Sequence, residues 1–171
     1  AALVKILFAP WRLEYVSTSD NRDKSECIFC RAYSSPDDRE TLTLRRDRAS
    51  FALLNLYPYT TAHAMVAPAK HCSSIADVDV PTLTEMMGTV KDLMAAMQQL
   101  YRPHGFNVGF NVGEAAGAGI EEHLHLHVVP RWHADNNFMT VLGATRVVPE
   151  DLGRTFDKMC GALETVSGGH D

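Results

Sequence analysis

The segment His123-Leu124-His125-Leu126-His127-Val128-Val129-Pro130 alternates histidine with apolar residues over its first six positions. This is the period of a half-buried β-strand, in which successive side chains point to opposite faces. The segment therefore predicts a strand with three imidazoles on one face and three apolar side chains on the other. Proline has no N–H group to donate, so Pro130 is predicted to end the hydrogen bonding of this strand.

Distances along a strand limit what three imidazoles can do together. A strand rises about 3.3 Å per residue, so neighbouring histidines stand roughly 6.6 Å apart and the outer two roughly 13 Å apart. The outer pair is too far apart to share one tetrahedral metal ion. We therefore expect at most two of the three to hold a common metal, which leaves at least one for other chemistry. Two simpler interpretations are polar residues on a solvated face and a face that only binds metal.

The same segment matches a known signature. From His123 to Val129 it reads His-φ-His-φ-His-φ-φ, where φ is apolar, and it resembles the histidine triad (HIT) superfamily without departure. Further segments extend the resemblance over most of the chain, toward the branch of bacterial diadenosine tetraphosphate phosphorylases and hydrolases. These segments are Leu54-Asn55-Leu56-Tyr57-Pro58-Tyr59, His63-Ala64-Met65-Val66-Ala67-Pro68, Arg102-Pro103-His104-Gly105-Phe106-Asn107-Val108-Gly109, Pro130-Arg131-Trp132 and Asn137-Phe138.

Length and composition are those of one ordinary globular domain. The 171 residues are 46% hydrophobic and 22% charged. A chain of this length and composition can bury a hydrophobic core without disulfides or metal ions to stabilise it. We expect a single HIT domain over 1–171, with an N-terminal arm at about 1–26. No apolar run approaches the roughly 18 residues of a membrane span, and residues 1–9 lack the pattern of a signal peptide. A cytoplasmic protein with no membrane partner is therefore expected.

The net charge of −5 argues against non-specific binding to duplex nucleic acid, which depends on neutralising phosphates with lysine and arginine. The resemblance implies a nucleotide or dinucleoside polyphosphate as substrate, and such a ligand must then be held by local groups. The resemblance also implies a homodimer, because HIT proteins commonly join two sheets into one.

The remaining sequence predicts the elements around the histidine strand. Apolar residues at spacings of three and four, an acidic start and Pro81 in the first turn predict one long helix at 79–100. Alternation at 105–113 predicts a neighbouring strand with one face of asparagine and glycine. The other predicted elements are strands at 41–44 and 49–56 with a bend at 45–48, a strand at 63–66, a strand or hairpin at 137–148, a closing helix at 149–166, and loops at 17–26 and 34–40.

The fold implied by the resemblance is α+β and HIT-like. It is an antiparallel sheet of about five strands with one long helix and a C-terminal helix. The long helix covers one face of the sheet, and the site is expected on the other face.

The cysteines suggest metal binding more than disulfides. Cys27 and Cys30 form a CxxC pair, a spacing that lets two thiolates reach one zinc ion. A redox pair would be expected at the start of a helix after a buried strand, and the polar run before Cys27 does not supply that strand. The resemblance implies a structural zinc site completed by His71 and His123. The alternative is a reduced thiol pair packed in the core.

Several residues are predicted to hold the nucleotide. Residues 114–119, Glu-Ala-Ala-Gly-Ala-Gly, form a loop whose amides can cradle a phosphate, with Gly117 and Gly119 the least shielded. The loop is neither a P-loop nor a dinucleotide-binding fingerprint. Asn111 is predicted to point into the site from the 105–113 strand. The resemblance implies that Asn55 holds the ribose, although an asparagine there can instead cap the bend that follows.

Two departures from the family pattern affect these expectations. Many HIT proteins place glutamine and serine or threonine just before the triad, whereas this chain has Gly119 and Ile120. Side-chain contacts to the phosphates and the leaving group are then missing, which leaves the preferred leaving group open. The glycine that usually precedes the fourth histidine is Ala62 here, and this puts the local backbone geometry in question.

The resemblance also implies a mechanism. A neutral imidazole is nucleophilic near pH 7 and becomes a good leaving group when protonated. His125 would attack the α-phosphate to give a nucleotidyl-histidine, which water or inorganic phosphate then resolves, so the covalent chemistry needs no cofactor. His127 would bond the phosphate oxygens, His63 would be the fourth histidine, and backbone groups around His123 would fix the tautomer of His125. Two rival functions are a hydrolase in which zinc activates water and a nucleotide-binding module with little catalysis.

Overall fold

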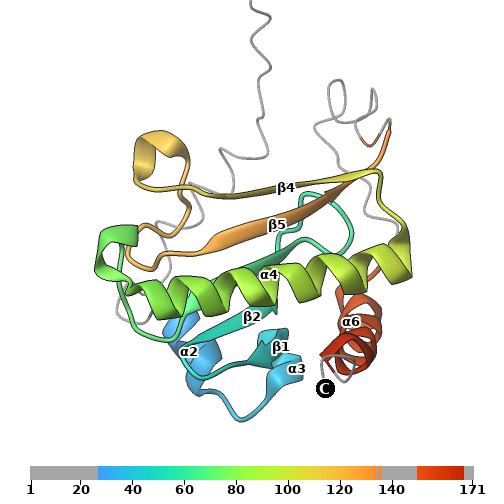
Figure 1. The fold of residues 1–171 in the computed structure, drawn as a ribbon, viewed down its shortest axis with the longest axis horizontal. Coiled ribbons are helices and arrows are strands. Elements are labelled where there is room, and N and C mark those ends of the chain that lie inside the picture. Colours follow the sequence, from blue (N-terminus) through green and yellow to red (C-terminus); the bar gives the residue numbers. More distant parts are fainter. Residues whose placement is uncertain (1–26, 134, 136–149, 168–171) are drawn as a thin grey trace, which may run out of the picture.

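The computed structural model describes residues 27–133, 135 and 150–167 (Figure 1). The predicted N-terminal arm at 1–26 and the predicted strand or hairpin at 137–148 lie outside the described residues. Within the described part, five strands form one antiparallel sheet in the order β1-β2-β3-β5-β4. The α+β fold class with about five strands is therefore confirmed.

The strands are β1 (Thr43–Arg46), β2 (Ser50–Leu54), β3 (Ala64–Pro68), β4 (Gly105–Phe110) and β5 (Leu126–Arg131). The helices are α2 (Ile28–Ser34), α3 (Asp38–Thr41), α4 (Val80–Tyr101) and α6 (Leu152–Ser167), with short 3-10 turns at η1 (Ile75–Asp77) and η2 (Glu114–Ala116).

Alternating side chains divide the sheet into two faces. One face packs against α4 and α6 in the larger apolar core, which includes Leu126 and Val128 of β5. Figure 1 shows α4 lying across this face, with α6 beside the C-terminal end of α4. The residues between the core positions point to the opposite face. There a smaller cluster joins the sheet to α2, and it consists of Phe29, Ala32, Phe51, Leu53, Met65 and Ala67.

Helix α4 begins and ends almost as the sequence predicts. The Asp79 carboxylate accepts the N–H of Thr82 as an N-cap. The helix ends at Tyr101, and its C-cap Arg102 is left-handed and precedes Pro103. Met87 is one of the apolar residues at spacings of three and four that predict a buried side of this helix, but it is exposed. The closing helix also forms, as α6. No helix in the described part is both long and apolar enough to cross a membrane.

The histidine strand is shorter at its start and longer at its end than predicted. It begins at Leu126, because the N–H of Leu124 donates to the carbonyl of Cys72 in a loop and not to a neighbouring strand. It also runs through Pro130, which pairs with Phe106 of β4. The Pro130 carbonyl accepts the Thr60 hydroxyl, so its backbone polar groups face away from β4 and the missing N–H breaks no β4–β5 bond.

The chain before β2 is more helical than predicted. The expected loop at 34–40 contains the end of α2 and most of α3, and Asp37 caps α3 by accepting the N–H of Glu40. Because α3 runs to Thr41, strand β1 starts later than predicted and includes Arg45 and Arg46, which were expected in the bend. Both guanidinium groups form ion pairs that hold them in the strand.

Register places the last triad histidine between two paired strands, β3 and β4. His127 lies opposite Met65 of β3 on one side and opposite Gly109 of β4 on the other. A Cβ atom built on Gly109 would meet no other atom within 4 Å. The small face predicted for 105–113 therefore leaves open space beside His127.

Candidate functional site

Five histidines and two cysteines gather on the face of the sheet opposite α4, and the fifth histidine is His71. His63, His123 and His125 are buried and His127 is half-buried. The ring centroids of His125 and His127 lie 4.9 Å apart, and those of His63 and His127 lie 5.1 Å apart. The triad thus forms a continuous row of imidazoles, with His63 of the loop before β3 beside its last member.

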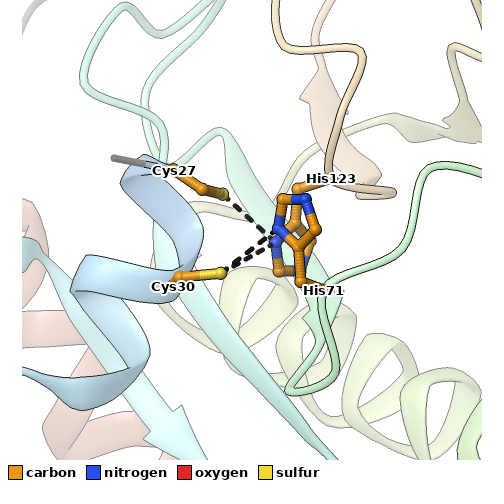
Figure 2. Close-up of side chains that lie close together, drawn as sticks. All are labelled: Cys27, Cys30, His71 and His123. Atoms are coloured by element: carbon orange, nitrogen blue, oxygen red, sulfur yellow. Dashed lines mark hydrogen bonds between the residues drawn. The ribbon is translucent and has the colours of Figure 1, made fainter. Parts of the chain in front are cut away.

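At one end of the row, four side chains converge as a candidate metal site. Figure 2 shows Cys27 and Cys30 reaching from α2 toward His71 and His123. The Cys27 Sγ to His123 Nδ1 and the Cys30 Sγ to His71 Nδ1 distances are both 3.3 Å, and Cys30 Sγ lies 3.7 Å from His123 Nδ1. All four donor atoms lie within 4.8 Å of one another.

The donor set fits zinc. Bonds of about 2.0–2.3 Å in a tetrahedral shell put neighbouring ligand atoms about 3.3–3.8 Å apart, which is the spacing of the three short distances. The other ring nitrogen of His123 donates to the carbonyl of Pro68 at 2.9 Å. Metal-bound histidines typically make this kind of bond, because it turns the lone pair of the opposite nitrogen to the metal.

The CxxC pair lies at the start of a helix, with Cys27 as the N-cap of α2. Redox pairs also occupy this position, but their thiols have a lowered pKa. Here burial and the neighbouring Cys27 thiol raise the pKa of Cys30 to about 11. A raised pKa leaves little thiolate near pH 7, so without metal the pair is poorly suited to thiol exchange.

In the middle of the row, His125 has a fixed tautomer. Its Nδ1 lies 2.8 Å from the carbonyl oxygen of His123, which can only accept a hydrogen bond, so Nδ1 carries the proton. The lone pair of the ring is then on Nε2. Burial lowers the pKa of His125 below its ordinary value, which keeps the ring neutral near pH 7.

At the other end, a chain of hydrogen bonds fixes the tautomers of two rings. The amide of Tyr59 donates to Nδ1 of His63 at 3.1 Å, so the proton of His63 is on Nε2. His63 Nε2 then donates to Nδ1 of His127 at 3.0 Å, which leaves an N–H on Nε2 of His127. Burial, helped by the charge of His125, lowers the pKa of His127 to about 4.

Two residues predicted to hold the nucleotide, Asn55 and Asn111, follow directly after β2 and β4. Asn55 accepts the amide of Tyr57 at 2.8 Å, as the capping alternative predicted, and its Nδ2 lies 3.5 Å from the sulfur of Met65. Asn111 lies just beyond β4, two residues after Gly109 and half-buried. Their nucleotide-binding roles stay predictions.

Some amides of the glycine-rich loop at 114–119 already donate hydrogen bonds to nearby carbonyls. It contains the turn η2, and Gly117 is left-handed with its amide donating to the carbonyl of Glu114. The amide of Ala118 donates to the carbonyl of Gly113. Any phosphate cradle in this conformation must therefore use other groups of the loop, such as those around Gly119, and the roles of Gly117 and Gly119 also stay predictions.

Sequence reasoning missed Phe29, Tyr59 and Thr60. Phe29 stacks on His125, and its position between two candidate metal ligands is a signal that could have marked it. Tyr59 acts through its backbone amide, which no side-chain pattern reveals. Thr60 binds β5 through a residue 70 positions away, and only the fold brings the two together.

The chain is similar in sequence to known proteins. A profile of the HIT domain matches residues 38–134 of the chain. An AP-4-A phosphorylase from Mycobacterium tuberculosis is 37% identical over 154 residues, which cover 87% of this chain and 79% of that protein. An adenosine 5'-monophosphoramidase from Saccharomyces cerevisiae is 26% identical over 138 residues, which cover 81% of this chain and 83% of that protein.

Solved structures share the fold. A zinc-bound histidine triad family protein from Mycobacterium smegmatis superposes with a TM-score of 0.68 at 24% identity, over 85% of this chain and 98% of that chain. A hypothetical histidine triad nucleotide-binding protein from Sulfolobus tokodaii superposes with a TM-score of 0.67 at 24% identity, over 85% of this chain and 99% of that chain. The HIT-like fold implied by the triad signature is therefore confirmed.

Proposed function

This chain belongs to the HIT family, and on that premise we propose that it cleaves dinucleoside polyphosphates of the diadenosine tetraphosphate type through a nucleotidyl-histidine intermediate. One observation carries the proposal. His125 has a lone pair on Nε2, and its neighbour His127 has an N–H on Nε2. A nucleophile beside a hydrogen-bond donor is what attack on a phosphate requires. The identity of 37% to an AP-4-A phosphorylase supports the substrate class.

In the first step, Nε2 of His125 forms a bond to the α-phosphorus of one nucleotide. The bond from that phosphorus to its bridging oxygen breaks, and the oxygen leaves with the rest of the polyphosphate. The imidazole becomes positively charged, and the carbonyl of His123 stabilises this charge by accepting the hydrogen bond from Nδ1. In the second step, an oxygen of inorganic phosphate or water bonds to phosphorus, and the P–N bond breaks to restore the lone pair of His125. When water is the acceptor, it releases a proton to the solvent in this step.

His127 is proposed to donate its Nε2 N–H to an oxygen of the attacked phosphate. The donor direction is set before substrate arrives, because His63 and the Tyr59 amide fix the tautomer. A preorganised donor of this kind typically contributes about 3–4 kcal/mol to the transition state. We propose Asn55, Asn111 and the loop around Gly119 as further nucleotide contacts.

The zinc, when bound, is proposed to be structural, held by Cys27, Cys30, His71 and His123. Four protein ligands fill a tetrahedral shell and leave no position for a water to be activated. This argues against the rival function in which zinc activates water.

The acceptor distinguishes a phosphorylase from a hydrolase. The name of the tuberculosis relative favours inorganic phosphate. Diadenosine tetraphosphate should give ADP and ATP when phosphate is the acceptor, and AMP and ATP when water is. Incubation with and without phosphate, followed by separation of the products and by acid-quench trapping of a nucleotidyl-enzyme, tests the proposal. Tight nucleotide binding with no turnover of any polyphosphate would instead support the binding-module function.

We further propose that the protein is a homodimer joined through β4. The other edge strand, β1, is covered by α2, α3 and α6, whereas β4 is paired only with β5 among the described residues. Val108 on β4 and Val112 just after it are 41% and 49% exposed. An apolar sheet edge of this kind readily pairs with another strand. Light scattering of the wild type and of Val108→Lys tests this, and a monomeric wild type would contradict it.

A further inference from the structure

Helix α2 brings a third residue into the site besides its two cysteines. Phe29 lies between Cys27 and Cys30, and its ring is completely buried. The ring centroid lies 4.7 Å from that of His125 with 29° between the two planes, a stacked geometry. It also lies 5.1 Å from the ring centroid of His123, in a tilted geometry. One phenyl ring therefore contacts both the middle histidine and a member of the candidate metal site.

Hydrogen bonding alone does not fix the His125 ring completely. The bond from its Nδ1 to the carbonyl of His123 holds one edge of the imidazole, but the ring can still tilt about the line of that bond. A flat aromatic surface stacked on the ring opposes this tilt, because offset-stacked rings attract beyond their apolar contact. A reacting group must be held within about 0.5 Å and 10–20° of its productive geometry.

We propose that Phe29 is a positioning residue that sets the plane of the His125 imidazole and so the direction of its Nε2 lone pair. The two flanking cysteines hold Phe29 in place, because both thiols contact histidine nitrogens of the candidate metal site. A change in that site which moves α2 then moves the stacked ring as well. This inference rests on the proposed function, since it takes His125 as the nucleophile.

Phe51 offers a matched control. It is also completely buried and belongs to the same apolar cluster as Phe29. Its ring contacts those of Phe29 and Tyr33, and no ring contact with a histidine occurs for Phe51 within the described residues. Phe29→Leu and Phe51→Leu therefore remove the same group from the same cluster, but only the first removes the stack on His125.

The test compares the two variants for stability, kinetics and the state of His125. Thermal unfolding should show a similar loss of stability for both. Phe29→Leu should lower kcat about tenfold with little change in KM, since small misplacements of reacting groups cost this much or more, whereas Phe51→Leu should leave kcat nearly unchanged. Long-range 1H–15N NMR spectra should show shifted or broadened His125 ring signals only for Phe29→Leu. Equal kcat for the two variants, or a change in KM alone for Phe29→Leu, would overturn the proposal.

The role of the cysteines is tested in the protein without metal. Treatment with a chelator should shift the His125 ring signals of the wild type in the direction seen for Phe29→Leu, and the Phe29→Leu signals should change less. Added zinc alone should reverse the shift. Unchanged His125 signals after proven loss of zinc would overturn the link between the cysteines and His125.

Failure of this inference can be told apart from failure of the proposed function. If His125→Ala keeps full turnover, the nucleophile assignment fails whatever the NMR spectra of Phe29→Leu show. If His125→Ala is inactive but the Phe29 and Phe51 variants behave alike, the nucleophile stands and only the positioning role is lost.

Discussion

The two ends of the triad carry their proton on the same nitrogen, Nε2, but the protein binds opposite nitrogens of the two rings. His123 turns its Nδ1 toward two thiols and donates from Nε2 to a backbone carbonyl. His127 instead accepts at Nδ1 from His63 and keeps a proton on Nε2. Three histidines spaced two residues apart thus offer different groups to a ligand: His123 a lone pair on Nδ1, His125 a lone pair on Nε2, and His127 an N–H on Nε2. Each ring does so because it meets a different fixed donor or acceptor. The comparison shows that the chemistry of a triad member is set by its neighbours and not by the motif.

The largest effect is expected from the residue between the two ends. His125→Ala should lower kcat by on the order of 10⁴-fold or more, because loss of a covalent nucleophile removes the reaction path itself. No nucleotidyl-enzyme should be trapped after acid quench. His104→Ala is the control, since His104 is exposed and stacks on His133 away from the triad. Turnover close to wild type in His125→Ala would remove this residue from the nucleophile role.

Removing the metal from the candidate site at the His123 end of the triad should mainly reduce the stability of the protein. If zinc is present at about 1,000 times its dissociation constant, it contributes about 4 kcal/mol, so chelation should lower the melting temperature by roughly 8–16 °C for a chain of this size. Scanning calorimetry with and without chelator checks this, together with metal analysis. A Cys30→Ala variant should start at a lower melting temperature and respond less to chelator. An unchanged wild-type melting temperature would favour the reduced thiol pair.

At the His127 end of the triad, which hydrogen bonds to His63 hold in place, the contribution to stability should decrease in acid. The pKa of His127 is lowered from 6.5 to about 4, mainly by burial. Between these values the unfolded chain binds a proton that the folded protein does not, so stability is lost as pH falls from about 6.5 to about 4, at up to about 1.4 kcal/mol per pH unit.

Urea unfolding at pH 7, 6 and 5 measures this slope, and the informative quantity is the difference between the wild type and His127→Gln. The variant should lose less stability on acidification than the wild type. His104→Gln, at an exposed position, is the matched control. Parallel slopes for the wild type and His127→Gln would show that His127 does not carry the acid sensitivity.

A smaller effect on stability is expected at the hydrogen bond that joins Thr60, near His63, to Pro130 of β5. The buried Thr60 donates to the carbonyl of Pro130 at 2.9 Å and accepts the amide of His63 through its own carbonyl. Thr60→Val should cost about 1–2 kcal/mol, because a buried acceptor loses its partner, and should also lower kcat by loosening His63. Thr60→Ser should restore both.

Thr61→Val controls for this change in urea unfolding and kinetics. Thr61 is equally buried, and its hydroxyl has no hydrogen-bond partner among the described residues. Equal losses for the Thr60 and Thr61 variants would mean that the bond to Pro130 contributes nothing specific.

Local patterns in the sequence correctly predicted those features that are set by residues close together in the chain. Alternation placed Leu126 and Val128 in the core, and capping with apolar spacing defined α4 almost to the residue. The clustering of Cys27 with His123 came from family resemblance and not from spacing. The start of β5 at Leu126 was missed, because the bond that diverts Leu124 reaches the distant Cys72. The resemblance implied that backbone groups around His123 fix the tautomer of His125, and the His123 carbonyl does so. The tautomers of His63 and His123 were beyond prediction, since the Tyr59 amide and the Pro68 carbonyl meet these imidazoles only in the folded chain.

The smallest effect is expected at Ala62, where family members usually have glycine. Ala62 has φ of 62°, in the left-handed region, and its methyl group is buried in the larger core. Glycine would relieve about 1 kcal/mol of backbone strain, but it would lose about 0.8 kcal/mol of buried methyl contact and make the unfolded chain more flexible. Because these terms oppose one another, Ala62→Gly should change the free energy of unfolding by less than about 1 kcal/mol and leave kcat unchanged. Ala62→Val, which adds a β-branched side chain to a left-handed residue, should destabilise clearly in the same urea titration, and a tolerant Ala62→Val would contradict the left-handed geometry.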